Sequence, residues 1–124
     1  MSETFLSFEQ SLARLDEILK EPKTIANRDS SIKRFELTAE LLWKSIQKFL
    51  REKKIICRSP KDCLDEAFSI GLLSDEVGWL KIIDDRNESM HTYSEEFAEA
   101  LYERLPSYLE LLRGLQKSLR MSDA

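Results

Sequence analysis

The sequence predicts an all-α protein, an antiparallel helical bundle with a four-helix-type core and one additional short helix. Glycine and proline number only three each among 124 residues, so turns are few and the elements between them must be long. The chain is rich in Leu, Glu and Lys, which favour helices over strands. Apolar residues recur at intervals of three and four, the period of a helix with one buried face. The length fits a single domain covering residues 1–124.

The composition narrows the class of protein. Hydrophobic residues make up 42% and charged residues 34%, which is too apolar for a disordered chain and too charged for a membrane protein. The net charge of −4 argues against a protein that coats nucleic acid, but it leaves room for a local basic groove. The segment from Met1 to Gln10 lacks the basic start of a signal peptide, and no apolar run approaches a membrane span. We therefore expect a cytoplasmic protein with no membrane contact.

The two cysteines and the one histidine bear on metal and redox chemistry. Cys57 and Cys63 are expected to be reduced thiols, because a domain of this size needs no disulfide and the cytoplasm is reducing. A zinc site built from Cys and His would have too few ligands, since His91 is the only histidine. We predict no metal and no other cofactor.

The first predicted helix is amphipathic and ends near Pro22. The segment 21–28 is predicted to be a linker, with Pro22 and Asn27 as helix breakers. The apolar positions of this helix are Phe5, Phe8, Leu12, Leu15 and Leu19.

The second predicted helix has the most regular pattern, with Asp29 or Ser30 as its N-cap. Leu41 and Trp43 lie beside its apolar stripe and either widen the buried face or contact a partner. The stripe suits antiparallel packing in a bundle. It consists of Ile32, Phe35, Ala39, Leu42, Ile46 and Phe49.

A third and a fourth helix are predicted from their end signals. Ser59 is an N-cap, Pro60 suits the first helical position, and Gly71 ends the third helix. Ser74 followed by Asp75 starts the fourth helix, which runs to about Arg86 or beyond. Its predicted inner face is Val77, Leu80 and Ile83, with Trp79 and Ile82 beside it.

The last helix is predicted to begin with a capping box formed by Thr92 and Glu95. Pro106 lies inside its pattern and should kink it. Its long apolar face is Phe97, Leu101, Leu105, Tyr108, Leu112, Leu115 and Leu119.

The region around His91 holds the densest run in the chain of polar side chains that could take part in catalysis. One interpretation is a solvated helix end, where His91 favours the helix dipole. The other is a functional site. Arg86 and His91 are five positions apart and differ by about 140° around a regular helix, so they converge only if the helix loosens or if two chains meet. A symmetric dimer would supply two imidazoles for acid–base chemistry and two arginines to stabilise a charged phosphorane.

Two other kinds of site have less support in the sequence. Glu88-x-x-His91 has the spacing used in di-iron bundles, but such a site needs a second copy of the motif and two further carboxylates. The sequence holds one copy, so no metal site is predicted. It also lacks the Gly-rich phosphate loops of nucleotide-binding folds.

A basic run follows the middle of the second predicted helix. Basic residues are expected at a helix C-terminus, which is the structural interpretation. The functional interpretation is a surface for a phosphate backbone or an acidic partner. Its candidate residues are Lys44, Lys48, Arg51 and Lys54.

The segment Arg86 to Tyr93 resembles the Arg-x4-His-x-Tyr motif of HEPN domains, in particular the HepT-like branch, also called nucleotidyltransferase substrate-binding proteins. The segment Arg34 to Lys44 is similar to the second-helix signature of that family. Ser59-Pro60-Lys61, followed by Ala67-Phe68 and Gly71-Leu72, is similar to its third-helix region. The resemblance covers nearly the whole chain, and the three segments occur in the family's order.

The resemblance implies a helical bundle that dimerises around the motif, or forms a higher even oligomer, and pairs with a minimal nucleotidyltransferase encoded nearby. Many such proteins are toxins of toxin–antitoxin pairs that cleave RNA without metal. Arg86 and His91 correspond to the catalytic pair, and Asn87 to the polar residue that orients the site. Tyr93 corresponds to the motif tyrosine, which can receive an adenylyl group from the partner.

Three functions follow as hypotheses. The first is a HepT-like toxin with metal-independent endoribonuclease activity at a dimer-interface cleft, neutralised by a nucleotidyltransferase antitoxin. The second is a non-catalytic substrate-binding or regulatory subunit of a nucleotidyltransferase complex. The third is a structural helical dimer.

Overall fold

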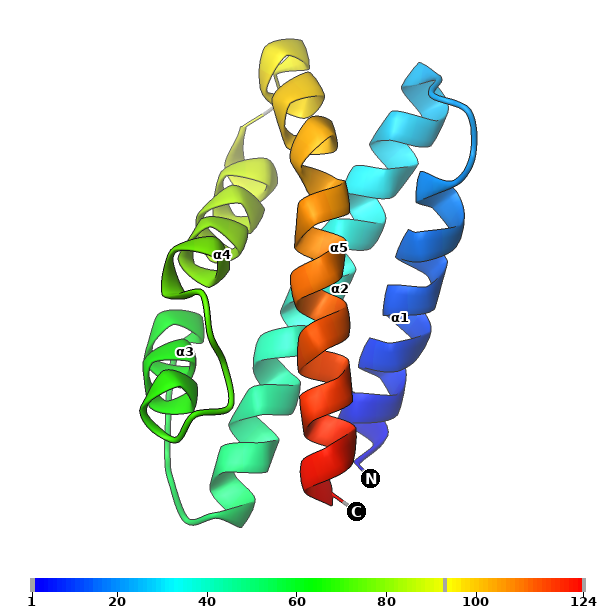
Figure 1. Cartoon of the computed structure of the whole chain (residues 1–124). Coiled ribbons are helices and arrows are strands. Elements are labelled where there is room, and N and C mark those ends of the chain that lie inside the picture. The colour runs from blue at the N-terminus through cyan, green and yellow to red at the C-terminus, as the bar shows by residue number, and fades with distance from the viewer. Residues whose placement is uncertain (1, 93, 124) are drawn as a thin grey trace.

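The computed structural model describes residues 2–92 and 94–123, and these form five helices and no strand. The all-α prediction is therefore confirmed. Figure 1 shows that the three long helices run along the length of the molecule, while the two shorter ones follow each other along one side and together take the fourth position of the bundle. The helices are α1 (Glu3–Leu19), α2 (Ile25–Glu52), α3 (Pro60–Ser69), α4 (Glu76–His91) and α5 (Glu95–Asp123).

The core lies between α2 and α5 and is closed by the other helices. The predicted apolar stripes of α1, α2 and α5 are largely buried, which confirms their helical period. Within the described residues, no helix combines the length and the apolar character that a bilayer crossing requires. The core residues include Phe8, Leu15, Phe35, Leu42, Ile46, Leu101, Leu105 and Leu112.

The start of α2 differs from the prediction. The helix begins at Ile25, and Thr24 caps it by accepting a hydrogen bond of 3.0 Å from the backbone N–H of Asn27. The prediction of Asp29 or Ser30 as the cap was therefore wrong, as was Asn27 as a breaker. The physical reason is a distant contact: the side chain of Arg28, only 2% exposed, needs a helical backbone to reach α5.

The buried guanidinium of Arg28 joins the first turns of α2 and α5. It lies 2.8 Å from Glu95 and 2.9 Å from Glu99, both on α5, and 2.9 Å from its neighbour Asp29. The hydrogen bonds that Arg28 donates to Glu95, Glu99 and Asp29, in that order of effect, raise the pKa of Arg28 above its usual value. A buried charge is tolerated when it is paired in this way.

The cysteines are joined by a disulfide between Cys57 and Cys63, so the prediction of reduced thiols was wrong. Their Cα atoms lie 5.0 Å apart, and both side chains are buried in the core. Cys57 lies in the loop before α3, where its carbonyl accepts a hydrogen bond of 3.0 Å from Gln47 on α2, and Cys63 lies in the first turn of α3. Ser59 then caps α3, as predicted, by accepting a bond of 3.2 Å from the N–H of Asp62.

The inner face of α4 is rotated from the predicted one. Val77 is 77% exposed, whereas Trp79, Ile82 and Ile83 are buried. Val77 was therefore a wrong prediction for this face. The buried side also carries Asp85, whose partners lie on α5, and this pairing orients the helix.

The junction between α4 and α5 uses a different cap from the predicted capping box. The hydroxyl of Ser94 accepts a hydrogen bond of 3.2 Å from the N–H of Phe97, the position of an N-cap. The side chain of Thr92 instead donates to Glu88 at 2.9 Å and closes the end of α4. Thr92 as the cap of the last helix was therefore wrong. The helix α5 continues through Pro106, and the kink there stays a prediction.

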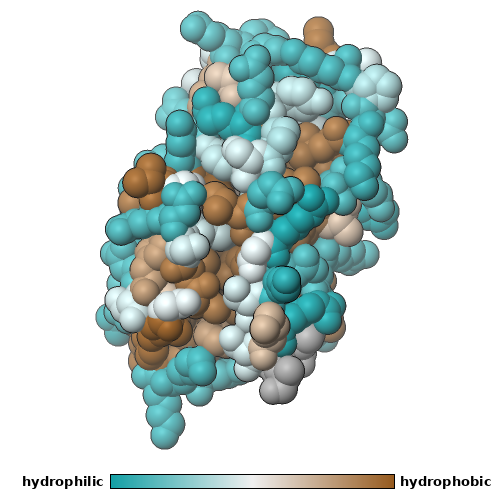
Figure 2. Space-filling view, in the orientation of Figure 1, coloured by the Kyte–Doolittle hydropathy of each residue, from teal (hydrophilic) through white to brown (hydrophobic). Residues whose placement is uncertain are grey.

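Some apolar side chains remain at the surface. Figure 2 shows hydrophobic residues gathered over the α3 side of the face seen in Figure 1. Ile56, Ile70 and Val77 are exposed, by 68%, 41% and 77%. Trp79 is buried within the chain, so it does not contribute to this surface.

Candidate functional site

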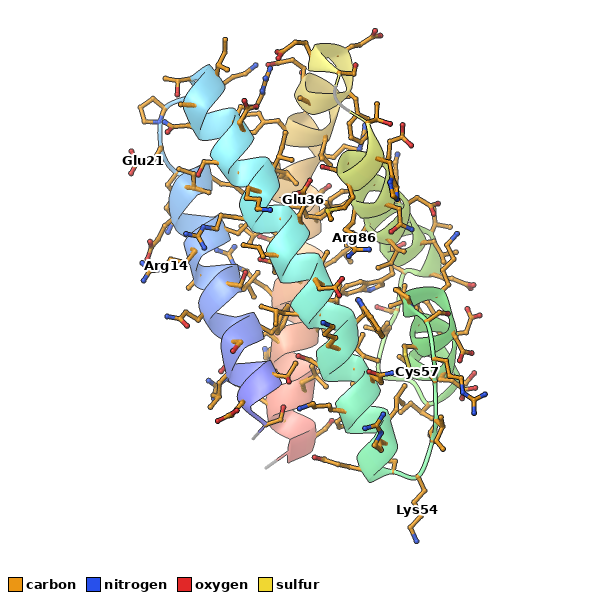
Figure 3. The ribbon with its side chains drawn as sticks, turned by 180° about the vertical axis from the view of Figure 1, so that it is seen from behind. Arg14, Glu21, Glu36, Lys54, Cys57 and Arg86 are labelled. Atoms are coloured by element: carbon orange, nitrogen blue, oxygen red, sulfur yellow. A yellow bond between two sulfur atoms is a disulfide. The ribbon has the colours of Figure 1, made fainter. Side chains whose placement is uncertain are left out.

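The side chain of Arg86 is held between α4 and α2. Its Nη2 donates to a carboxylate oxygen of Glu40, and its Nη1 donates to the side-chain oxygen of Asn87 at 3.1 Å. The side chain is 22% exposed, so it is partly accessible to solvent. Its Nε is buried and has no hydrogen-bond partner among the described residues. Figure 3 shows Arg86 projecting from α4 toward α2.

The carboxylate of Glu40 is the centre of a small charged cluster. It accepts hydrogen bonds from Arg86 and, at 3.1 Å, from the indole Nε1 of Trp43, and Lys44 lies 3.3 Å away. Burial acts to raise the pKa of Glu40, but the hydrogen bonds from Trp43 and Lys44, together with the charge of Arg86, outweigh it and hold the pKa below its usual value. Glu40 is therefore ionised at neutral pH and is available to pair with the motif arginine.

A buried network directly before Arg86 fixes α4 against α5. Arg104 donates to both oxygens of Asp85, at 2.8 and 3.1 Å, and the hydroxyl of Tyr108 donates to the same carboxylate. Burial, reinforced by the bond to Asp85, raises the pKa of the Tyr108 phenol above its usual value. Its ring also stacks on Phe35 of α2, with centroids 5.7 Å apart. The network therefore ties α4, α5 and α2 together at the motif.

His91 is exposed and is the last residue of α4. The helix is regular from Arg86 to His91, so their side chains diverge by about 140°. One chain therefore does not bring the imidazole and the guanidinium together. The helix therefore does not loosen before His91, which was one of the two ways in which these side chains were expected to converge.

The acidic residues that flank the motif do not form one negative surface. Asp85 is turned inward, and Asp84 is exposed but lies 3.1 Å from Lys61 of α3. Glu88 accepts a hydrogen bond from Thr92. Two of the three carboxylates are thus paired with cations, which reduces the repulsion of a phosphate near Arg86.

A groove adjoins the motif between α2 and the ends of α4 and α5. It has a volume of about 270 Å³, and its apolar wall includes Ile32, Phe97 and Leu101. Its polar edge includes Glu36, whose carboxylate accepts a hydrogen bond from Ser89 inside the motif. Glu36 and Arg86 come from facing helices and lie on the same side of the molecule (Figure 3).

The four predicted basic residues are spread along α2 and beyond its end. Lys44 shares Glu40 with Arg86 and so belongs to the motif cluster. Lys48 borders a small hollow near the start of α1, and Arg51 is exposed in the last turn of α2. Lys54 has a φ of 65° and lies at the end of the molecule remote from Arg86 (Figure 3). The sequence run therefore does not fold into one basic patch.

Tyr93, the predicted modification acceptor, lies outside the described residues. Among the residues that are described, no three His, Cys, Asp or Glu side chains are grouped as metal ligands. The resemblance-based site is thus represented in the structure by Arg86, Asn87 and His91.

Sequence reasoning missed Glu40 and the pair Arg104 and Tyr108. Glu40 lies within the segment Arg34 to Lys44 that carries part of the family resemblance, which was the available signal. Arg104 and Tyr108 had no such signal, because nothing local to α5 indicates a carboxylate partner on α4.

Comparisons with known proteins agree with this geometry. Residues 3–121 match the family model described as nucleotidyltransferase substrate binding protein like. A probable ribonuclease HepT from Haemophilus influenzae is 33% identical over 95 residues, which cover 73% of this chain and 65% of that protein. The chain thus spans slightly less than two thirds of the length of that relative.

Two solved structures share the fold. A protein from Thermus thermophilus has a TM-score of 0.85 and 40% identity, covering 91% of this chain and 98% of that one. A protein from Haemophilus influenzae has a TM-score of 0.70 and 28% identity, covering 94% of each chain. Its structure was described as revealing the fold of a substrate binding domain of a nucleotidyltransferase.

Proposed function

This chain belongs to the nucleotidyltransferase substrate-binding protein family, in its HepT-like branch, and on that premise we propose that it is a metal-independent endoribonuclease. The observation that carries the proposal is Arg86, a partly exposed arginine held by acceptors on two sides, on the same helix as an exposed His91 five residues later. Such an arginine suits a phosphate, and such a histidine suits proton transfer.

In the proposed reaction the imidazole of His91 removes the proton of a ribose 2′-hydroxyl. The freed oxygen attacks the adjacent phosphorus, and Arg86 neutralises the charge of the phosphorane that forms. The bond to the 5′-oxygen then breaks, and a protonated imidazole gives that oxygen its proton. The products are a 2′,3′-cyclic phosphate and a free 5′-hydroxyl, and no metal or redox step is needed.

We propose that two copies of the chain build this site. The acid and the base act at the same time, and each chain supplies one imidazole. The divergence of Arg86 and His91 on a regular α4 supports the same arrangement, because a two-fold axis beside α4 brings His91 of one copy toward Arg86 of the other.

The nucleotidyltransferase partner is part of the proposal. The family and the HepT-like relative support a toxin whose activity in the cytoplasm is controlled by a minimal nucleotidyltransferase. Transfer of an adenylyl group from a nucleoside triphosphate to the phenol of Tyr93, with release of pyrophosphate, would add a phosphate charge to the motif that contains Arg86, and we propose that this charge competes with RNA. Tyr93→Phe should prevent the gain in mass on co-expression with the partner and leave the toxin active.

A second candidate function is a non-catalytic binding subunit of that nucleotidyltransferase. It is favoured by the structural relative whose fold was described as a substrate binding domain. In this function Arg86 and the groove beside Ser89 would bind a partner or its substrate, and His91 would have no chemical role.

Cleavage of RNA in the presence of a chelator tests the first candidate. His91→Ala should lower the rate by about 10²–10⁴, the usual contribution of acid–base catalysis. Arg86→Ala should lower it by about 10²–10³, the usual contribution of a donor that stabilises the charge of the transition state. Gln10→Ala, an exposed change on α1, should have no effect. Products that carry a 2′,3′-cyclic phosphate would support the reaction given above. A purified wild-type protein that binds the nucleotidyltransferase and cleaves no RNA would leave the binding-subunit function instead.

A further inference from the structure

We propose that Glu40 is a positioning residue that orients the guanidinium of Arg86 toward an incoming phosphate. The inference rests on the proposed function of Arg86 and adds to it a residue from α2, outside the motif. Glu40 acts through Arg86 and is not itself expected to touch the substrate.

The argument starts from the donors of the guanidinium, which carries five N–H groups. One on Nη2 points to Glu40 and one on Nη1 points to Asn87. The N–H of Nε is buried, without an acceptor among the described residues. This leaves one donor on each terminal nitrogen for the oxygens of a phosphate.

Glu40 is itself held in place by its own helix. The indole N–H of Trp43 and the ammonium of Lys44 lie one turn further along α2, at 3.1 and 3.3 Å from the carboxylate. The carboxylate therefore meets Arg86 from a fixed direction. Because the ion pair joins α2 to α4, it also determines how the guanidinium is turned about the end of its long side chain.

The same contact has an opposite interpretation, in which Glu40 blocks Arg86 and competes with phosphate. The two interpretations predict opposite effects of removing the charge of Glu40 on phosphate recognition. If Glu40 positions the guanidinium, removing its charge weakens phosphate recognition. If Glu40 blocks it, removing the charge strengthens recognition.

The test compares Glu40→Gln, which keeps the shape of the side chain, with Glu40→Asp, which keeps the charge but shortens the reach. Glu52→Gln is the matched control, an exposed glutamate on the same helix. Circular dichroism and thermal unfolding establish that each variant is folded. The readouts are single-turnover cleavage and the binding of a short labelled single-stranded RNA by the full chain.

Glu40→Gln should lower the cleavage rate by about 10²-fold, as expected when a catalytic group is misplaced by about 1 Å. Glu40→Gln should also bind the labelled RNA more weakly, because the same guanidinium recognises the phosphate before the reaction. The double variant Glu40→Gln, Arg86→Ala should be no slower than Arg86→Ala alone, because Glu40 acts only through Arg86. Glu52→Gln should match the wild type. Faster cleavage or tighter RNA binding by Glu40→Gln would overturn the proposal.

A direct measurement separates this inference from the ribonuclease proposal. In ¹⁵N NMR the Nη–H signals of Arg86, assigned with Arg86→Ala, should be slow to exchange in the wild type, where Nη2 donates to Glu40, and fast in Glu40→Gln. An unchanged exchange rate would overturn the inference even if RNA is cleaved.

The RNA-binding experiment separates the two proposals in a second way. If the wild type binds RNA without cleaving it, a weaker binding by Glu40→Gln still supports the role of Glu40, while the ribonuclease proposal fails. A wild type that neither binds nor cleaves RNA would overturn both.

Discussion

At the scale of single residues, the carboxylates next to the motif have different environments although they are neighbours in sequence. Asp85 is buried and receives three hydrogen bonds from Arg104 and Tyr108 within the described residues. Asp84 is exposed and pairs only across the surface with Lys61. The sequence shows two adjacent acids, and the fold makes one of them structural and leaves the other in solvent.

The pair Asp85 and Asp84 provides a matched test of stability. Asp85→Ala should lower the free energy of unfolding by roughly 2–4 kcal/mol, because it leaves Arg104 and the Tyr108 hydroxyl without their acceptor. Asp84→Ala removes an exposed ion pair and should cost at most about 1 kcal/mol. Urea unfolding of both variants measures the difference. Equal losses would show that the buried network does not secure α4.

Glu40 makes the stability of the folded chain depend on pH. Its pKa is lowered in the folded state, so its ion pair contributes stability above the unfolded pKa of about 4.3 and loses it as pH falls through the folded pKa. The stability difference between the wild type and Glu40→Gln should therefore be largest near neutral pH, on the order of 1 kcal/mol. It should disappear in acid. Unfolding curves at neutral and acidic pH check this, and a gap that grows on acidification would contradict it.

At the scale of elements, helix ends decide how much of each helix is available for packing. The start of α2 at Ile25 adds the turn that carries Arg28 to α5. The rotation of α4 buries Trp79 and leaves Val77 exposed. Both changes come from pairings with α5, which local patterns do not contain.

The early start of α2 predicts the effect of removing its cap. Thr24→Ala should cost about 1 kcal/mol, because the N–H of Asn27 loses its acceptor. Ser30→Ala, at the position predicted as a cap, should cost nothing, since Ser30 is exposed within the helix and Ala is the better helix former. Chemical denaturation of the two variants measures this. A larger loss for Ser30→Ala would place the helix start where the sequence alone predicted it.

At the scale of the whole molecule, the proposed chemistry requires more than one copy. Leu41 and Trp43 are half-buried against the core, and Trp79 is fully buried. Trp79, which was predicted to lie beside the inner face of α4, is therefore not available to a partner surface. The case for a dimer now depends on the single imidazole and on the divergence of Arg86 and His91.

We expect the purified chain to be a dimer or a higher even oligomer. An obligate interface would bury over about 2,000 Å². Sedimentation at micromolar concentration should give twice the mass of the chain or a higher even multiple. A monomer with full ribonuclease activity would contradict the two-copy site.

The amino-acid sequence by itself determined the helical class, the order of the five helices in the described residues and the segments that identify the family. These follow from apolar period and from caps such as Ser59, which act over a few neighbouring residues.

Tertiary structure decided the rest. The start of α2, the face of α4, the disulfide between Cys57 and Cys63, and the pairing of Arg86 with Glu40 each join segments that pack together only in the folded chain. A local sequence pattern shows only which side chains are able to form ion pairs and hydrogen bonds. Which pairs form depends on how helices remote in sequence are packed, because ion pairs and buried hydrogen bonds need their partners within a few ångströms.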